Sequence, residues 1–92
     1  MAYFALIYDV VADYLEKRVQ FREEHLGLAR KAHEAGELVM AGAFTEPSDR
    51  ALFVFRGADK SAAEAFAKSD PYVKNGLVKK WEARSWNVVI GG

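Results

Sequence analysis

The sequence predicts an α+β fold built on one antiparallel sheet, and two observations support this class. First, the segments typical of strands and helices follow one another in the order βαββαβ along the 92 residues. That order is the ferredoxin-like arrangement, in which two helices pack on a four-stranded sheet. Second, the length is that of one domain spanning residues 1–92, because domains usually hold about 50–250 residues.

The first half of the chain predicts a strand, a long helix and a second strand. Residues 3–10 are rich in aromatic and β-branched side chains and indicate a strand. Asp13, followed three residues later by Glu16, resembles a capping box and begins a helix that we expect to run unbroken over residues 13–35. Gly36 supplies the usual helix stop. Residues 38–44 form the second strand, which we expect Gly42 to interrupt.

The second half predicts a turn, two strands and two short helices. Residues 45–50 have the composition of a turn, and residues 51–55 that of a strand. Ser61, with Glu64 three positions on, is expected to cap a helix. Asp70 and Pro71 suit the N-cap and first position of a further helical turn, which ends at Gly76. Residues 78–90 form the last strand, with a bulge or bend expected near Trp86.

Both faces of the predicted sheet are apolar, although two helices can cover only one. In the first strand Tyr3, Ala5 and Ile7 alternate with Phe4, Leu6, Tyr8 and Val10. An antiparallel sheet with one solvated face would alternate with polar residues instead. We therefore expect a homodimer that packs two such sheets face to face. An enlarged pocket within one subunit is the alternative explanation.

Composition and charge narrow the classes of partner. Thirteen basic and thirteen acidic residues give zero net charge, whereas nucleic-acid binding normally leaves a basic footprint. Residues 50–55 faintly resemble an RNA-binding strand, but the glycines of that motif are absent. Cysteine is absent, and no apolar run approaches a membrane span. We expect a soluble, cytoplasmic protein that binds neither nucleic acid nor membrane.

Two histidines are the candidates for chemistry, and both lie on the predicted long helix. His25 belongs to an apolar row, with Arg22 one turn earlier; it is either a histidine at the edge of the core or a general base beside a pocket. His33 suits the cation-favouring end of the helix, which is a structural role. The two are eight residues apart, too far to share one metal ion readily. We expect no metal and no redox cofactor.

Asp70 also allows two interpretations, one structural and one functional. As the N-cap before Pro71 it is explained by local structure alone. A carboxylate held by the backbone also suits the orientation of an imidazole, as in catalytic dyads. Sequence spacing does not show whether Asp70 reaches His25.

Four motifs resemble the YciI-like (YCII-related) family and extend over most of the chain. They are R-x-x-x-R-x-x-H-L at residues 18–26, H-x-x-G-x-L at 33–38, A-G at 41–42 and D-P-Y-V-x-x-G-L at 70–77. The resemblance implies a dimeric α/β-barrel with an active site containing a His–Asp pair. By position, that pair is His25 and Asp70, with Arg22 and Tyr72 beside it. The resemblance also implies dehydrochlorination of chlorinated hydroxyquinols as one reaction of relatives.

The leading hypothesis is a small enzyme of lyase or isomerase type, because such proton transfers need no cofactor. His25 would act as general base or acid, with Asp70 fixing its tautomer. Arg22 would hold an anionic or phenolate oxygen of a small cyclic or aromatic substrate, since guanidinium suits planar anions. The alternative is a non-catalytic, dimeric module that binds a small ligand in the same pocket.

Overall fold

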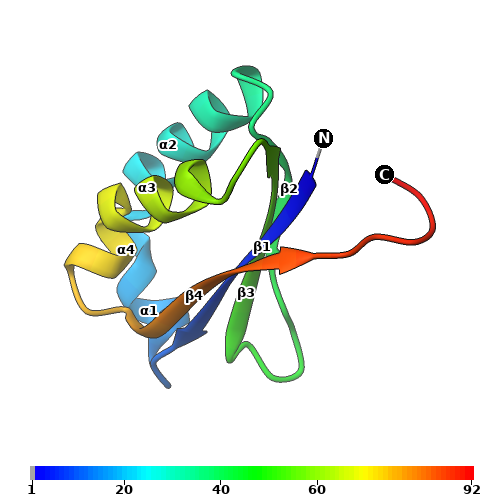
Figure 1. Cartoon of the computed structure of the whole chain (residues 1–92). Coiled ribbons are helices and arrows are strands. Elements are labelled where there is room, and N and C mark those ends of the chain that lie inside the picture. Colours follow the sequence, from blue (N-terminus) through cyan, green and yellow to red (C-terminus); the bar gives the residue numbers. More distant parts are fainter. Residues whose placement is uncertain (1) are drawn as a thin grey trace.

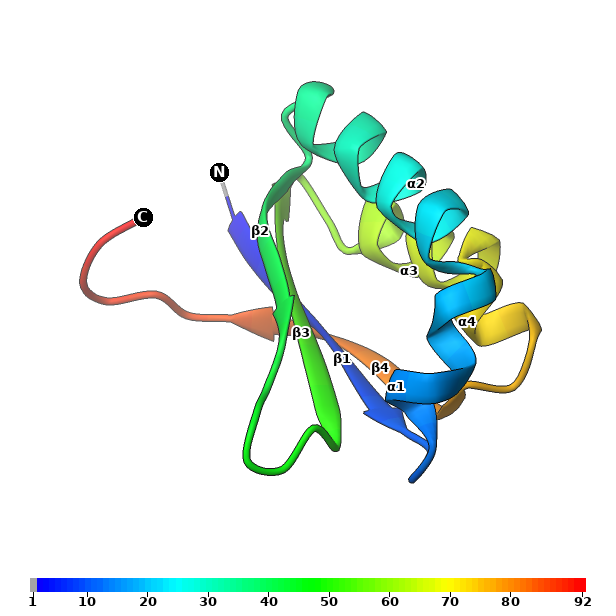
Figure 2. The same ribbon diagram turned by 180° about the vertical axis from the view of Figure 1, so that it is seen from behind.

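A computed structural model describes residues 2–92 and shows one layer of helices on one sheet. The sheet is antiparallel throughout, with the strand order β2-β3-β1-β4. All helices lie on the same side of it (Figures 1 and 2). This is the α+β, ferredoxin-like βαββαβ arrangement predicted from the order of segments. The elements are β1 (Ala2–Val10), α1 (Tyr14–Lys17), the 3-10 turn η1 (Arg18–Gln20), α2 (Arg22–Glu34), β2 (Leu38–Ala43), β3 (Arg50–Gly57), α3 (Ser61–Ser69), α4 (Pro71–Lys74) and β4 (Val78–Trp86).

The core lies between the sheet and the helices. β1 is a central strand, and its side chains alternate between buried and half-buried along its length. The buried ones face the helices, as the period of two requires. They meet buried side chains of β3 and α3, so that aromatic rings fill most of this layer. The largest buried members are Tyr8, Tyr72, Phe55, Leu6 and Leu77.

The long helix expected over residues 13–35 is broken into α1, η1 and α2, so that prediction was wrong. The 3-10 turn changes the phase of the helix, and the apolar side chain of Val19 within it is 73% exposed. The break lets Tyr14 on α1 pack edge-to-face on Tyr72 while His25 on α2 stacks on the same ring. A single straight helix could not direct both side chains to the Tyr72 ring. Tertiary packing therefore overrides the helical periodicity of the sequence at this point.

Two predicted helix caps differ in the structure. Asp13 precedes α1, but its carboxylate makes no capping hydrogen bond and instead lies 3.3 Å from the Lys17 ammonium. Ser61 is the first residue of α3 rather than its cap, and its backbone N–H donates to Asp59 Oδ1 at 2.9 Å. In both places a charged side chain two or four residues away competes with the expected cap, and sequence spacing alone does not show which contact forms.

The other helix ends agree with the prediction. Asp70 accepts a hydrogen bond from the backbone N–H of Tyr72, with Pro71 at the first position of α4. Gly36 and Gly76 have φ values of 82° and 78°, the left-handed conformation that stops a helix at low cost.

The strand predictions need three corrections. Gly42 does not interrupt β2, since it pairs with Leu52 of β3 within the ladder. The last strand ends at Trp86, opposite Tyr3, and not at residue 90 as expected. The bulge expected near Trp86 is also absent from that place. The register shift between β1 and β4 lies at the other end, between Asp9 and Val10.

The second face of the sheet carries no layer of its own within residues 2–92 (Figures 1 and 2). Register places Met40, Leu52 and Ile7 on this face of β2, β3 and β1, and Met40 is 65% exposed. We call it the open face. Separately, none of the described helices has the length and hydropathy of a membrane span.

Two glycines, one inside α2 and one just past its C-terminal end, provide a matched test of the backbone. Gly36→Ala should lower the free energy of unfolding by about 1–2 kcal/mol, because a side chain at this positive φ is strained. Gly27→Ala should raise it by about 1 kcal/mol, because Gly27 lies inside α2 with open space around its Cα. Urea unfolding of both variants measures the pair. Equal effects of the two substitutions would contradict the assigned conformations.

Candidate active site

Asp70 is the centre of the site, and local backbone structure places it. It lies between the end of α3 and the start of α4 in extended conformation, with φ −70° and ψ 125°. Its side chain is fully buried. The backbone N–H of Tyr72 donates to its Oδ1 at 3.0 Å. A buried carboxylate is therefore held in a defined orientation by the chain that follows it.

His25 lies directly against this carboxylate, although 45 residues separate the two in sequence. Its Nδ1 is 2.9 Å from Oδ1 and 3.0 Å from Oδ2 of Asp70. An ionised carboxylate only accepts hydrogen bonds, so Nδ1 carries the proton and donates it. Nε2 is then left as the free nitrogen of the neutral ring. The structure thus brings together the two residues predicted as a pair.

Aromatic rings hold the imidazole in one plane. The ring of Tyr72 stacks on His25 with centroids 3.9 Å apart and an interplanar angle of 9°. Phe53 and Phe66 meet it edge-on, at 5.9 and 6.2 Å. Because one face and the edges are packed, the ring cannot rotate freely away from Asp70. Tyr72, expected beside the pair, is part of its support.

Tyr8 is a member of the site that the sequence analysis did not single out. Its hydroxyl donates to Asp70 Oδ2 at 2.7 Å, and its side chain is fully buried. Burial, together with the neighbouring Asp70 charge, raises the pKa of Tyr8 far above its usual range. The hydroxyl therefore stays protonated and remains a donor. Its signal in the sequence was a tyrosine on the buried side of a strand, where a hydroxyl needs a partner.

A cavity of about 230 Å³ opens beside His25. Cavities near 150 Å³ are known to hold a benzene molecule, so this one has room for a single substituted ring. Its cationic members are Arg18 and Arg22, and no carboxylate from residues 2–92 lines it. The remaining walls are mostly apolar. The full lining is Tyr14, Arg18, Arg22, His25, Leu26, Ala29, Ala41, Gly42, Ala43, Ala51, Phe53 and Tyr72.

The polar groups of the cavity favour a negatively charged ligand atom. The Tyr72 hydroxyl is buried and has no hydrogen-bond partner among the described residues. Burial raises the pKa of Tyr72, with a contribution from Tyr14, while Arg22 and Arg18 lower it in part. Arg18 also lies over the Tyr14 ring, 5.3 Å from its centroid. An unpaired hydroxyl near two guanidinium groups can bind one oxyanion.

His33 has a separate structural role, as the sequence favoured. Its Nδ1 lies 2.8 Å from the carbonyl oxygen of Leu38 and so ties the end of α2 to the start of β2. His33 lies outside the cavity beside His25. Within residues 2–92, no group of three or more histidines and acidic residues has the spacing of a metal site.

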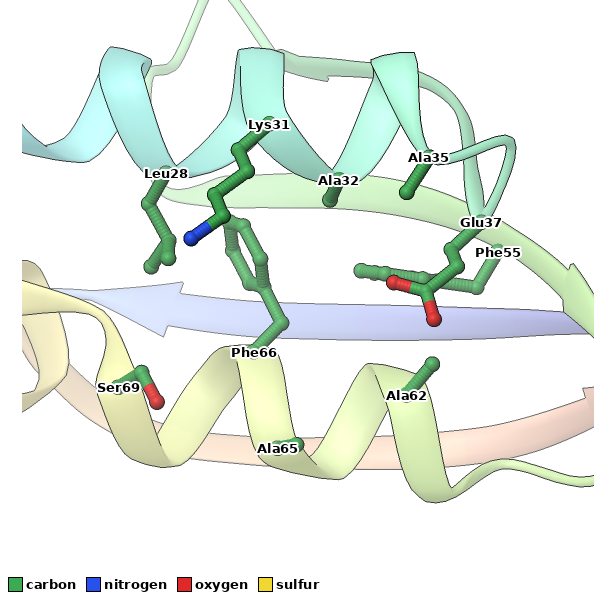
Figure 3. A pocket seen from close by; sticks show the side chains of 10 residues that line it. All are labelled: Leu28, Lys31, Ala32, Ala35, Glu37, Phe55, Ala62, Ala65, Phe66 and Ser69. Carbon is green, nitrogen blue, oxygen red and sulfur yellow. The ribbon is translucent and has the colours of Figure 1, made fainter.

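A second cavity, of about 310 Å³, lies between α2 and α3 (Figure 3). Phe66 and Phe55 lie between the two helices, and alanines line both sides. Its polar members are Lys31, Glu37 and Ser69, and all three are exposed. We assign no ligand to this cavity, because its polar groups are already hydrated at the surface.

The fold and site together define a class of small α+β proteins in which a buried His–Asp pair adjoins a cavity. The YCII-related domain matches residues 1–87, and the chain belongs to this family. It is 35% identical over 88 residues to Protein YciI of Escherichia coli and of Shigella flexneri. That alignment covers 86% of this chain and 90% of each relative.

Solved structures share the fold at low sequence identity. A 5-chloro-2-hydroxyhydroquinone dehydrochlorinase from Burkholderia phenoliruptrix, complexed with 2,5-dihydroxybenzoquinone, superposes with a TM-score of 0.75 at 14% identity. The match covers 92% of this chain and 93% of that one. A NIPSNAP family protein from Agrobacterium tumefaciens gives 0.60 at 14% identity, covering 96% and 92%. An antibiotic biosynthesis monooxygenase gives 0.56 at 11%, covering 98% and 100%. At these identities the likeness concerns the fold.

The raised pKa of Tyr8 predicts a loss of stability at alkaline pH. Tyrosine in the unfolded chain ionises near pH 10, whereas the folded protein keeps Tyr8 neutral. This contribution is therefore complete below about pH 10 and is lost as the pH rises above it. Each pH unit above that point should cost about 1.4 kcal/mol for this one group.

Urea unfolding of the wild type and of Tyr8→Phe over an alkaline pH series measures this effect. The wild type should lose stability more steeply than the variant, by the contribution of one proton. Parallel curves for the two proteins would contradict the assignment.

Proposed function

We propose that this protein is a small acid–base enzyme of lyase or isomerase type that acts on a single-ring cyclic or aromatic substrate. The observation that carries the proposal is the buried His25–Asp70 contact with Nε2 left free beside the cavity. A neutral imidazole in this tautomer is a general base whose basic nitrogen is already directed away from its orienting carboxylate.

The chain's own residues divide the work as follows. His25 Nε2 takes a proton from the substrate, and Asp70 stabilises the imidazolium that forms, as a buried carboxylate does in dyads. Arg22 and the Tyr72 hydroxyl hold the oxygen on which negative charge develops. The imidazolium then returns the proton to the product or to the leaving group. Elimination or isomerisation of this kind consumes no oxidant or reductant.

The dehydrochlorinase with the same fold indicates which substrates to try first. Loss of HCl from a chlorinated hydroxyquinol removes one proton and one chloride, which matches a site with one base and an oxyanion-binding group. The volume of the cavity also suits a single ring. Chlorinated hydroxyquinols are therefore the first substrates to test. The absence of a metal, of a redox cofactor and of nucleic-acid binding, and the cytoplasmic location, stay predictions from the sequence.

Substitution of the two histidines provides a matched test of catalysis. His25→Gln should lower turnover of an active substrate by about 10²–10⁴-fold, the usual contribution of a positioned acid–base group. His33→Gln should leave turnover unchanged, because His33 bonds to the Leu38 carbonyl outside the cavity. Chloride release from 5-chloro-2-hydroxyhydroquinone provides the readout.

Two results would argue against the enzyme. Full turnover by His25→Gln would show that His25 is not the general base. Tight binding of single-ring compounds by the wild type, without turnover of any, would favour the non-catalytic ligand-binding module.

The partner that best fits the open face is a second copy of this chain. Apolar side chains occupy this face on three adjacent strands, and within residues 2–92 no helix covers it. An antiparallel sheet that faced water there would carry polar residues instead. Two open faces packed together would give the dimeric α/β-barrel that the resemblance implies.

Sedimentation tests the dimer directly. The wild type should sediment at twice the 10.3 kDa chain mass at micromolar concentration. Leu52→Lys should shift it to the monomer, because a buried, unpaired ammonium at the interface is costly. Val19→Lys places the same charge on an exposed apolar residue in the helix layer, and it should stay dimeric. A monomeric wild type would contradict the proposal.

A further inference from the structure

The Tyr8 hydroxyl is the one group on Asp70 that neither the helix cap nor the proposed acid–base pair accounts for. The Tyr8 ring packs on Phe53 with centroids 4.7 Å apart, and phenylalanine would fill that space equally well. A buried hydroxyl costs about 1–3 kcal/mol if it is unpaired, and the Tyr8 hydroxyl pairs with Asp70. Packing alone therefore gives no reason for a hydroxyl at this position.

The two oxygens of Asp70 are held by different elements. Oδ1 accepts from the backbone N–H of Tyr72, on α4, and Oδ2 accepts from the hydroxyl of Tyr8, on β1. His25, on α2, approaches both oxygens at nearly equal distances, 2.9 and 3.0 Å. Without the Tyr8 hydroxyl, Oδ2 would keep His25 as its sole donor. With Tyr8 present, each oxygen of the Asp70 carboxylate accepts a hydrogen bond from a group other than His25.

Among the described residues, no lysine or arginine forms an ion pair with Asp70. Its charge is therefore stabilised by hydrogen bonds. The shortest of these, at 2.7 Å, comes from Tyr8. A donor to a carboxylate withdraws charge from it, and donors on one carboxylate compete with each other. The titratable and charged groups that surround the pair are Tyr8 from β1, Tyr14 from α1, Arg18 from η1, Arg22 from α2 and Tyr72 from α4.

We propose that Tyr8 is a positioning residue for His25: by donating to Oδ2 it fixes the plane of the Asp70 carboxylate and limits how strongly that carboxylate holds the Nδ1 proton. The consequence for catalysis rests on the proposed function, because it acts through the basicity of Nε2. The hydrogen-bond relay itself, Tyr8 to Asp70 to His25, can be tested without any substrate.

Nuclear magnetic resonance of the Nδ1 proton measures this relay. In Tyr8→Phe the carboxylate loses a competing donor, so its bond to His25 should strengthen and the Nδ1 proton should move downfield. Tyr3→Phe is the matched control, since it removes a hydroxyl from the opposite face of the same strand, where it bonds to Gly92. Spectra of both variants are recorded at neutral pH and low temperature, beside the wild type. An Nδ1 proton that stays in place or moves upfield in Tyr8→Phe overturns the proposal.

A second measurement uses the wild type, in case Tyr8→Phe does not fold. With tyrosine labelled at 13Cζ, the Tyr8 resonance should titrate together with the ring protons of His25, while the Tyr3 resonance stays still. If the chemical shift of Tyr8 does not change with that of the His25 ring protons, the relay is overturned.

The two proposals fail separately. If His25→Gln retains full turnover while the relay signals appear, the proposed chemistry fails and the positioning of His25 by Tyr8 stands. If the relay signals are absent while His25→Gln loses turnover, Tyr8 is a core residue beside a working base.

Discussion

The structure depends on one buried carboxylate. Asp70 collects hydrogen bonds from β1, α2 and α4, which are otherwise remote in sequence. A carboxylate removed from water is costly unless its lone pairs are filled, so these three elements must meet at one place. The same contacts that satisfy Asp70 orient His25 and leave its Nε2 free. Stability of the core and readiness for proton transfer therefore have a common origin.

The break in the first helical region serves this centre. An unbroken helix over residues 13–35 would keep one phase, whereas the 3-10 turn η1 allows α1 and α2 to present different sides to the core. Tyr14 can then pack on Tyr72 from one direction while His25 stacks on it from another. Arg18, within the turn, and Arg22, just after it, are carried to the rim of the cavity. A local irregularity thus brings two cations beside the imidazole.

The two faces of the sheet divide the tasks of the molecule. One face carries the aromatic core and supports the His–Asp pair. The open face presents apolar side chains such as Met40 and Leu52, and the proposed second subunit would remove them from water. The cavity reaches residues 41–43 on β2, which is an edge strand. The site therefore lies near the boundary between the helix layer and the sheet edge, where a small ligand can enter.

The sequence by itself determined the order of elements, the two apolar faces and the local cap at Asp70, because these depend on residues close together in the chain. It also placed His25 in an apolar row, where an ionisable group needs a partner. The family resemblance named Asp70 as this partner, but only the tertiary structure decided that the two side chains meet, that Tyr8 joins them and that the first helix breaks. The physical reason is that spacing along a chain carries no information about which buried donors meet which acceptor; packing of separate elements against one sheet settles that.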